Sequence, residues 1–389
     1  MAKIGIIISS LYACGGEERV VSLMANEWVK KHEITIYTFE NREYEGNQND
    51  YYLSDQIKIK RVMNPPITWQ GKIIKLLYYY FGVPSDRFLP RLLKNTIYPD
   101  MFLKEWRDRI NNEKFDIVIG VSGIYSVLLG LIQNEISAKL VGWQHSSYEG
   151  YFDPRKGYYR NQKKIFKESV EKLDACIVLN KDIQEKYQKE LGLKTEVIFN
   201  PKSFASRIKA DVSQQCFVTC GRVEEEKGYD DLIEAFYKFN RFNSNWKLLI
   251  IGGGSLKEQL ECKIQEKNLG DKATITGYVH NVRELLLRGS VFIMTSRWEG
   301  FPMSITEALE LGLPIIAYGI PAMEPLVSNG VEGRIVPPFD NDLLVDAMKD
   351  LASDRIKRQH MSNAAVQKAM TLTPESISQY WFRLFDKMN

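Results

Sequence analysis

Short apolar runs alternate with amphipathic stretches of helical spacing along almost the whole chain. In the first half, five runs are expected to form strands: residues 4–9, 34–39, 117–121, 140–143 and 176–179. In the second half, five more are expected: residues 216–220, 247–251, 273–276, 291–294 and 314–317. Such alternation is typical of parallel sheets covered by helices, so the pattern predicts an α/β protein.

The series of strands starts again near Cys216, which indicates two domains. The chain has 389 residues, more than one ordinary hydrophobic core accommodates. We place the linker at residues 199–212 and the domains at residues 1–200 and 201–373. Two doubly wound domains joined in this way are expected to leave a cleft between the carboxyl ends of their strands, where such sheets bind ligands.

The last segment, residues 374–389, has large apolar residues at helical spacing. One face of the predicted helix carries Ile377, Tyr380, Trp381, Leu384 and Phe385. A face with so much aromatic surface needs a partner surface elsewhere in the chain.

Composition narrows the class of protein. The net charge of +3 is too small to suggest nucleic-acid binding. The apolar run at residues 4–8 is too short for a signal peptide, and the uncharged stretch at residues 117–132 contains Gly and Ser, so it is interpreted as strand, turn and helix. We therefore expect a cytoplasmic protein.

The cysteines are scattered and follow no metal-binding spacing. They are Cys14, Cys176, Cys216, Cys220 and Cys262. We expect buried free thiols in a reducing compartment, and no metal site.

The segment at residues 297–308 carries the most informative pattern, two glutamates eight positions apart. A Gly-Phe-Pro turn follows Glu299, and Pro302 suits the first position of a helix that ends before Gly312. Glu299 is therefore expected in a loop and Glu307 within the helix. Carboxylates accept hydrogen bonds from sugar hydroxyls, and a helix N-terminus attracts phosphate, so the segment suits a phosphorylated sugar ligand.

Two cations follow the first strand of the second half. Arg222 comes directly after this strand, and Lys227 is expected to open the next helix. Both cations are suited to a diphosphate. The alternative is that they pair with the acidic residues 224–226 at the surface.

Glycine-rich turns follow other predicted strands. Gly15-Gly16 and Gly252-Gly253-Gly254 let a backbone approach a ligand closely, although each alone also fits an ordinary tight turn. Tyr278 and Val279 follow another strand and can flank a nucleobase through main-chain groups. His145 stands at the carboxyl end of a first-half strand among polar residues, where the alternative to a functional role is a structural one.

These motifs together resemble the retaining glycosyltransferases of the GT-B fold, specifically glycosyltransferase family 4, over nearly the whole chain. They occur in the family's order: Gly15-Gly16, His145, Gly221-Arg222 with Lys227-Gly228, the glycines at 252–254, and the two glutamates. The resemblance implies two Rossmann-like domains facing across a cleft. It also implies that residues 374–389 cross back onto the N-terminal domain.

The resemblance implies a role for each site residue. Arg222 and Lys227 clamp the diphosphate of a nucleotide-sugar donor, Glu307 binds the ribose, and Glu299 contacts the donor sugar. Gly16 lies against the diphosphate, and His145 reaches the donor sugar or the reacting phosphate. The remaining donor-binding positions are Gly253, Tyr278, Val279, Gly300, Phe301, Pro302, Met303 and Ser304. No cofactor and no metal are expected, because the cations stabilise the leaving diphosphate.

The family retains the anomeric configuration of the transferred sugar. A retaining glycosidase does so with two close carboxylates, one of which is a nucleophile. The two glutamates are not expected to play these parts here, because the resemblance assigns Glu307 to the ribose. We favour front-face substitution, in which a donor phosphate oxygen takes the proton of the acceptor hydroxyl. Catalytic roles are assigned to His145, Arg222, Lys227 and Glu299.

The stretch at residues 56–99 carries eight Lys or Arg, one acid and many apolar residues: Trp69, Ile73, Ile74, Leu76, Leu77, Tyr78, Tyr79, Tyr80, Phe81, Phe88, Leu89, Leu92 and Leu93. We expect it to contact an anionic membrane surface and bring the active site to a lipid-linked saccharide. The alternative is that the apolar residues belong to the core and the basic ones to a solvated face.

The leading hypothesis is transfer of a hexose or N-acetylhexosamine, with a UDP-sugar as the default donor, to a lipid-linked saccharide in surface glycan biosynthesis. The protein is then cytoplasmic and peripheral on the inner face of the cell membrane. Two alternatives stay open: a soluble sugar acceptor, or a protein that binds nucleotide sugars without catalysis.

Overall fold

The computed structural model describes residues 1–12, 15–39, 53–63, 69–81, 85, 88–155 and 157–388, with backbone alone at 69–71, 75, 79 and 80. The chain forms two compact units. The first comprises Met1–Pro201 together with Pro374–Asn389, and the second comprises Lys202–Thr373. The linker expected at residues 199–212 thus contains the boundary between the units.

The first domain is built on a sheet of seven parallel strands among the described residues. Their order is β3-β2-β1-β4-β5-β6-β7. The strands are β1 (Lys3–Ile8), β2 (Glu33–Thr38), β3 (Lys58–Arg61), β4 (Ile117–Val121), β5 (Lys139–Trp143), β6 (Ala175–Val178) and β7 (Glu196–Val197). The central strands β1, β4 and β5 are apolar after their first residue because helices cover both faces of a parallel sheet.

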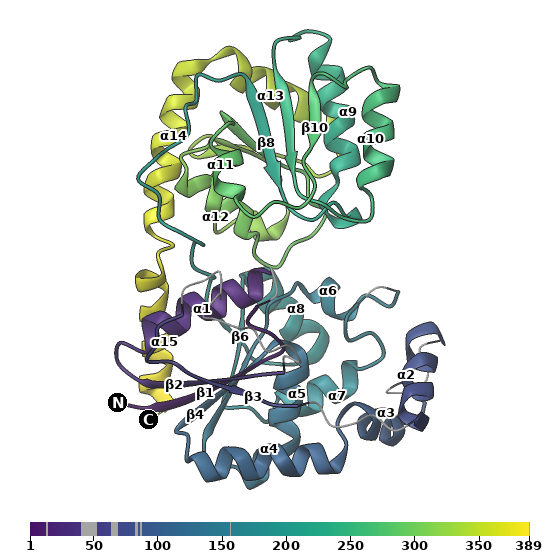
Figure 1. Ribbon diagram of the computed structural model, residues 1–389, viewed down its shortest axis with the longest axis vertical. Helices are drawn as coiled ribbons and strands as arrows, with labels where there is room; N and C mark the ends of the chain where they lie inside the picture. Colours follow the sequence, from purple (N-terminus) through teal and green to yellow (C-terminus); the bar gives the residue numbers. More distant parts are fainter. Residues whose placement is uncertain are drawn as a thin grey trace. The chain divides into compact units, whose positions relative to one another are not determined.

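Helices connect these strands, and α2 and α3 lie to one side of the sheet (Figure 1). They are α1 (Gly16–Trp28), α2 (Trp69–Phe81), α3 (Pro90–Ile97), α4 (Asp100–Glu113), α5 (Ser122–Ile132), α6 (Tyr148–Phe152), α7 (Lys163–Val170), α8 (Lys181–Leu191) and α15 (Pro374–Met388). The uncharged stretch at residues 117–132 is β4 followed directly by α5, so its interpretation as a strand and a helix is confirmed.

The last helix, α15, packs beside α1 in the first domain (Figure 1). The rings of Trp28 and Trp381 lie 4.9 Å apart, and those of Trp143 and Trp381 lie 4.7 Å apart. All three indoles are buried. The predicted return of the C-terminal helix is therefore confirmed, but Tyr380 was wrongly placed on its packed face: this side chain is 51% exposed.

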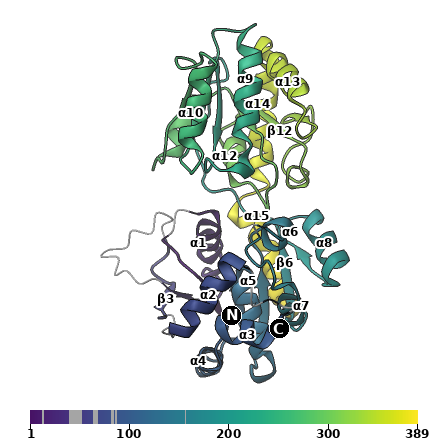
Figure 2. The same cartoon turned by 90° about the vertical axis from the view of Figure 1, so that its right-hand side faces the viewer.

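The second domain repeats the architecture with six parallel strands among its residues, in the order β10-β9-β8-β11-β12-β13. The strands are β8 (Cys216–Cys220), β9 (Lys247–Ile251), β10 (Ala273–Ile275), β11 (Val291–Met294), β12 (Ile315–Tyr318) and β13 (Gly333–Val336). The helices are α9 (Tyr229–Asn240), α10 (Lys257–Glu266), α11 (Val282–Leu286), α12 (Met303–Glu310), α13 (Asn341–Ser353) and α14 (Arg355–Met370). Helices α9 and α13 pack side by side, as do α12 and α14 (Figure 2).

Each sheet has the Rossmann order, in which the chain reverses its direction of winding at one point. This switch point lies between β1 and β4 in the first domain and between β8 and β11 in the second. Loops that leave the carboxyl ends of these strand pairs form the usual ligand position of such sheets. The prediction of two doubly wound α/β domains is thus confirmed.

The expected thiols are mostly, but not all, buried. Cys176 and Cys220 are buried and Cys216 is half-buried, but Cys262 is exposed on α10, contrary to expectation. None of these four forms a disulfide bond with another described residue, and Cys14 lies outside the described residues.

Candidate functional site

The switch point of the second domain gathers most of the predicted donor-binding residues. Strand β8 ends at Cys220 and leads to Arg222, and a short 3-10 helix over Glu225–Lys227 precedes α9. Lys227 therefore ends this 3-10 helix and does not open α9 as expected. Strand β11 leads to the loop that carries Glu299, and α12 begins at Met303. Glu299 in a loop and Glu307 in a helix are confirmed.

Lys227 and Glu299 form an ion pair between the two loops. Lys227 Nζ lies 2.6 Å from Glu299 Oε1, and the side chains are 16% and 14% exposed. The hydroxyl of Ser296 donates a second hydrogen bond to the same oxygen over 2.9 Å. The cation predicted to bind the diphosphate and the carboxylate predicted to contact the donor sugar are thus held together.

Arg222 behaves differently from Lys227. Its side chain is 65% exposed, and its guanidinium donates to Glu226 Oε1 over 3.0 Å. The alternative of surface pairing with the acidic residues 224–226 therefore holds for Arg222 in this structure but not for Lys227. An exposed, singly bonded guanidinium keeps donors available for a phosphate, so its proposed role stays a prediction.

Glu307 is buried on α12, with 5% of the residue exposed. The hydroxyl of Ser203 donates to Glu307 Oε1 over 2.8 Å, and Sγ of Cys220 lies 3.9 Å from Oε2. Ser203 was not predicted as a site residue, because its sequence neighbourhood after Pro201 indicates only a linker. Ser203 positions the carboxylate on the side of the switch point where β8 ends.

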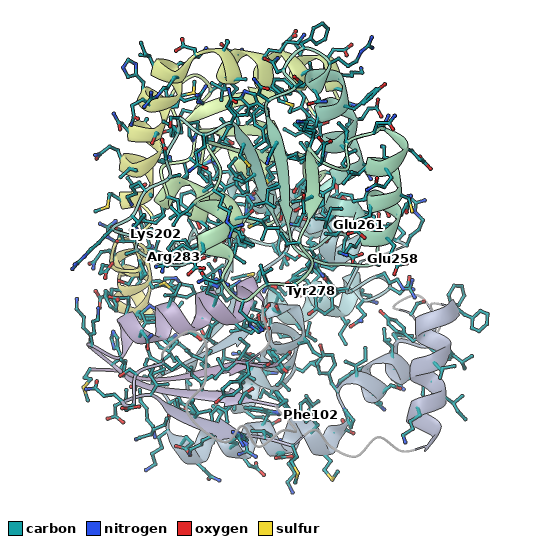
Figure 3. The ribbon with its side chains drawn as sticks, turned by 45° about the horizontal axis from the view of Figure 1, so that its top comes forward. Phe102, Lys202, Glu258, Glu261, Tyr278 and Arg283 are labelled. Atoms are coloured by element: carbon teal, nitrogen blue, oxygen red, sulfur yellow. The ribbon has the colours of Figure 1, made fainter. Side chains whose placement is uncertain are left out.

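Neighbouring Lys202 fastens the same segment to α12. Its ammonium forms an ion pair with Glu310, and both side chains are at most 5% exposed. Glu310 also accepts from Lys209 Nζ over 2.8 Å and from the backbone N–H of Ser206 over 2.7 Å. Lys202 is labelled in Figure 3. The residues after the domain boundary are thus held against the helix that carries Glu307.

The glycine-rich turn after β9 packs against the turn after β8. Gly252 has φ of +144°, and a Cβ atom there would collide with the carbonyl of Gly221, so glycine is required. The carbonyl of Gly253 accepts the N–H of Val223 over 2.9 Å. Beside it Tyr278 is 81% exposed and Val279 half-buried, on the loop after β10 (Figure 3).

The start of α12 supplies main-chain donors. Pro302 is the residue that precedes the helix, one position earlier than expected, and Met303 and Ser304 begin it. The first amides of a helix have no carbonyl partner within it and favour anions. Gly300 and Phe301 form the turn before the helix, with Phe301 6% exposed.

In the first domain, the structure places Gly16 and His145 at the carboxyl edge of the sheet. Gly16 is the first residue of α1, after β1, and His145 follows β5. The imidazole packs on Trp143 with 4.6 Å between ring centroids, and its Nε2 atom is buried without a hydrogen-bond partner among the described residues. Burial lowers the pKa of His145 to about 3. His145 is therefore a neutral imidazole at physiological pH and not a cation for the diphosphate.

Two protein families match the chain, and the boundary between their matches coincides with the domain boundary after Pro201. Residues 14–201 match the family described as Glycosyltransferase Family 4, and residues 202–368 match Glycosyl transferases group 1. A Campylobacter jejuni relative is 23% identical, with 99% of this chain and 98% of the relative covered. It is called GalNAc-α-(1→4)-GalNAc-α-(1→3)-diNAcBac-PP-undecaprenol α-1,4-N-acetyl-D-galactosaminyltransferase.

Solved structures share the fold over the whole chain. Staphylococcus aureus TarM, in a complex with Fondaparinux, α-GlcNAc-glycerol and UDP, superposes with a TM-score of 0.75 at 15% identity, covering 99% of this chain and 100% of TarM. Anabaena HepE, in a complex with UDP, has a TM-score of 0.75 at 16% identity, with both chains fully covered. Sucrose-phosphate synthase from Thermosynechococcus elongatus has a TM-score of 0.78 at 16% identity, covering 100% and 99%.

Two Rossmann-like domains, with the last helix returned to the first, define the GT-B class of glycosyltransferase folds. Within that class, the chain belongs to the family 4 glycosyltransferases, which confirms the resemblance stated from its motifs. The protein is thus a glycosyltransferase.

Proposed function

We propose that the protein transfers a hexose or N-acetylhexosamine from a UDP-sugar, with retention of anomeric configuration, to a lipid-linked saccharide in surface polysaccharide biosynthesis. The observation that carries this proposal is the Lys227–Glu299 pair at the switch point of the second domain. It unites a cation suited to a diphosphate with a carboxylate suited to sugar hydroxyls, beside the first turn of α12.

UDP as the donor nucleotide is supported by relatives of the same fold. TarM and HepE were both solved with UDP bound, and HepE also with UDP-glucose. In the proposed complex Glu307 binds the ribose hydroxyls, and backbone groups of Gly253, Tyr278 and Val279 surround the base.

The chemical step depends on stabilising the departing diphosphate. Negative charge grows on its oxygens as the bond to the sugar breaks, and Lys227, Arg222 and the amides of Met303 and Ser304 are placed to oppose it. Loss of one such contact is expected to slow transfer by about a hundredfold, or roughly 3 kcal/mol. We propose that these groups act without a metal ion; undiminished transfer after treatment with EDTA is the expected result, and loss restored by Mg²⁺ would contradict it.

We propose front-face substitution, in which a donor phosphate oxygen takes the proton of the acceptor hydroxyl. Neutral His145 then contributes a hydrogen bond to the donor sugar and no charge. Retention itself is checked by NMR of the product, where an inverted anomeric configuration would overturn this mechanism.

A lipid-linked saccharide as the acceptor is supported by the Campylobacter relative, whose name specifies an undecaprenyl diphosphate saccharide. That relative matches this chain over almost its full length. A lipid-linked acceptor requires the first domain to reach a membrane surface, although no helix among the described residues is long and apolar enough to cross a membrane.

Helix α2 supports such a contact. Four large apolar side chains along it are at least 43% exposed: Ile73, Leu76, Leu77 and Phe81. Phe88 and Leu89, before α3, are also exposed, while Leu93 is buried. Most of the described apolar residues in this stretch are therefore exposed and do not belong to the hydrophobic core. The side chains of Trp69, Lys75, Tyr79 and Tyr80, and all of Asp86 and Arg87, lie outside the described residues.

Tyr78 fastens α2 to the segment that precedes α7. The hydroxyl of Tyr78 donates to the carbonyl of Arg160 over 2.5 Å and accepts from Gln162 Nε2 over 2.8 Å. Exposed apolar groups on an anchored helix beside basic residues suit the interface of an anionic bilayer on the inner face of the cell membrane.

Vesicle sedimentation tests this contact. Phe81→Ser is expected to weaken binding to phosphatidylglycerol vesicles, whereas Phe242→Ser, at an equally exposed phenylalanine of the second domain, is expected to leave it unchanged. Absence of wild-type binding to these vesicles at low salt would sink the idea of membrane contact.

A further inference from the structure

The switch point of the first domain carries a polar pair. Glu17 is the second residue of α1, in the connection from β1, and Ser122 is the first residue of α5, directly after β4. Strands β1 and β4 are the neighbours between which the sheet changes its direction of winding. The pair thus occupies in the first domain the place that Lys227 and Glu299 occupy in the second.

Ser122 is held in an unusual backbone conformation. Its φ is +66°, in the left-handed region that favours glycine, yet the position holds a serine. Its hydroxyl donates a hydrogen bond to the carboxylate of Glu17, and its carbonyl accepts the hydroxyl of Ser126 over 2.9 Å. Unfavourable backbone conformations of this kind concentrate at functional sites.

Glu17 is half-buried, and its side chain forms no ion pair with another described residue. Burial, aided by the charge of Glu18, raises its pKa to about 7, although the hydrogen bond from Ser122 acts in the opposite direction. No cationic side chain is among the groups that shift this pKa. The residue as a whole is partly exposed.

Tyrosines surround this carboxyl. Tyr125 of α5, Tyr151 of α6 and Tyr159 all sense the charge of Glu17, and burial raises the pKa of each, so none of them titrates near neutral pH. The hydroxyl of Tyr151 also accepts the backbone N–H of His145 over 3.3 Å. Tyr151 thereby connects the carboxyl to the loop that carries the predicted catalytic histidine.

We propose that Glu17 and Ser122 bind a hydroxyl group of the saccharide acceptor and so help to select it. A carboxylate has room for hydrogen bonds beyond the one from Ser122, and sugar hydroxyls are suitable donors. This inference rests on the proposed function, because it assigns the acceptor side of the same reaction.

Steady-state kinetics with Glu17→Gln test this assignment. The acceptor probe is the undecaprenyl diphosphate saccharide named for the Campylobacter relative, and the donor probe is UDP-N-acetylgalactosamine. We expect the KM for acceptor to rise at least tenfold while the KM for donor and the rate of donor hydrolysis stay unchanged. Glu27→Gln, farther along α1, is the control and is expected to change none of these values.

The pH dependence of the KM for acceptor distinguishes a binding role of Glu17 from a purely structural role, which would not change it. As the pH falls through about 7, Glu17 takes up a proton and loses part of its capacity to accept hydrogen bonds. The KM for acceptor of the wild type should therefore rise, and Glu17→Gln should lack this inflection. Ser122→Gly, which suits the positive φ while removing the hydroxyl, should also raise the KM for acceptor.

Three results would overturn the inference. An unchanged KM for acceptor in Glu17→Gln would remove Glu17 from the acceptor site, and a matching rise in the KM for donor would place it against the donor. Absence of wild-type transfer from every nucleotide sugar to every saccharide tried would contradict the proposed function, and the acceptor role would fall with it.

Discussion

The ion pair between Lys227 and Glu299 predicts that replacing its two partners changes the affinity for UDP in opposite directions. In the structure the ammonium is 2.6 Å from the carboxylate, and each side chain is less than one-fifth exposed. A diphosphate must therefore compete with Glu299 for Lys227. Replacing Glu299 by Gln removes the competing charge, whereas replacing Lys227 by Met removes the binding charge.

The size of the effect follows from the geometry. Two unit charges about 4 Å apart attract by about 4 kcal/mol at an effective dielectric constant near 20, and desolvation offsets much of this attraction. Hydrogen bonds to charged groups retain roughly 1.5–3 kcal/mol. We expect Glu299→Gln to bind UDP about tenfold more tightly and Lys227→Met to bind it at least about tenfold more weakly, at about 1.4 kcal/mol per factor of ten.

Isothermal titration of UDP measures both affinities directly. Lys238→Met is the matched control, because it breaks a surface ion pair with Asp342 on the same domain and should leave UDP affinity unchanged. Transfer should slow in both Lys227→Met and Glu299→Gln, since we propose that each residue contacts the reacting sugar diphosphate. Equal weakening of UDP binding by both variants would refute the competition, and an unaffected Lys227→Met would refute the diphosphate assignment.

Three further predictions concern buried carboxylates. Lys202→Met leaves Glu310 with only Lys209 as a cationic partner and should lower the free energy of unfolding in urea by about 3 kcal/mol; an unchanged midpoint would contradict this. Glu17→Gln should raise the free energy of unfolding by up to about 3 kcal/mol above pH 7. The reason is that the raised pKa of Glu17 destabilises the folded wild type as the pH rises from about 4.5 to 7, so the gain should vanish below pH 4. A gain that does not depend on pH would exclude this cause. Glu307→Ala should weaken binding of UDP about tenfold or more in titration calorimetry, and unchanged affinity would show that Glu307 does not bind the ribose.

Apart from the edge strand β10, the strands that were predicted from the sequence are mostly buried on both faces. Residues 216–220 and 291–294 are continuous apolar runs because helices cover both sides of their sheet, and the structure has the strands with the same bounds. Three strands were missed, and each lies at a sheet edge: β3, β7 and β13. Strand β3 reads Lys-Ile-Lys-Arg, a charged pattern typical of protected edges that local hydrophobicity does not detect.

The candidate site was predictable where it depends on local chain chemistry. The turn before α12 and the helix itself place Glu299 and Glu307 from sequence alone. Their partners were not predictable, since Lys227 precedes Glu299 by 72 positions and Ser203 precedes Glu307 by 104. Contacts of this range depend on the packing of strands β8 and β11, which only the folded chain defines.

The charge states of His145 and Glu17 also could not be predicted from the sequence. His145 stands among polar neighbours in the chain, but the fold buries its ring against Trp143 and keeps it neutral. Glu17 was assigned no role from the sequence, and the fold places it beside Ser122. In both residues, burial in three dimensions determines the ionisation that the proposed chemistry uses.

The most direct test of the central claim is donor consumption coupled to product formation. The wild-type protein is incubated with a panel of radiolabelled UDP- and GDP-sugars and the undecaprenyl diphosphate saccharide, and both released nucleotide and lipid-linked label are counted. We predict that one UDP-hexose or UDP-N-acetylhexosamine is consumed in step with label transfer, and that Lys227→Met lowers the rate about a hundredfold. Tight binding of a nucleotide sugar with neither transfer nor slow hydrolysis would contradict the claim that this site is catalytic.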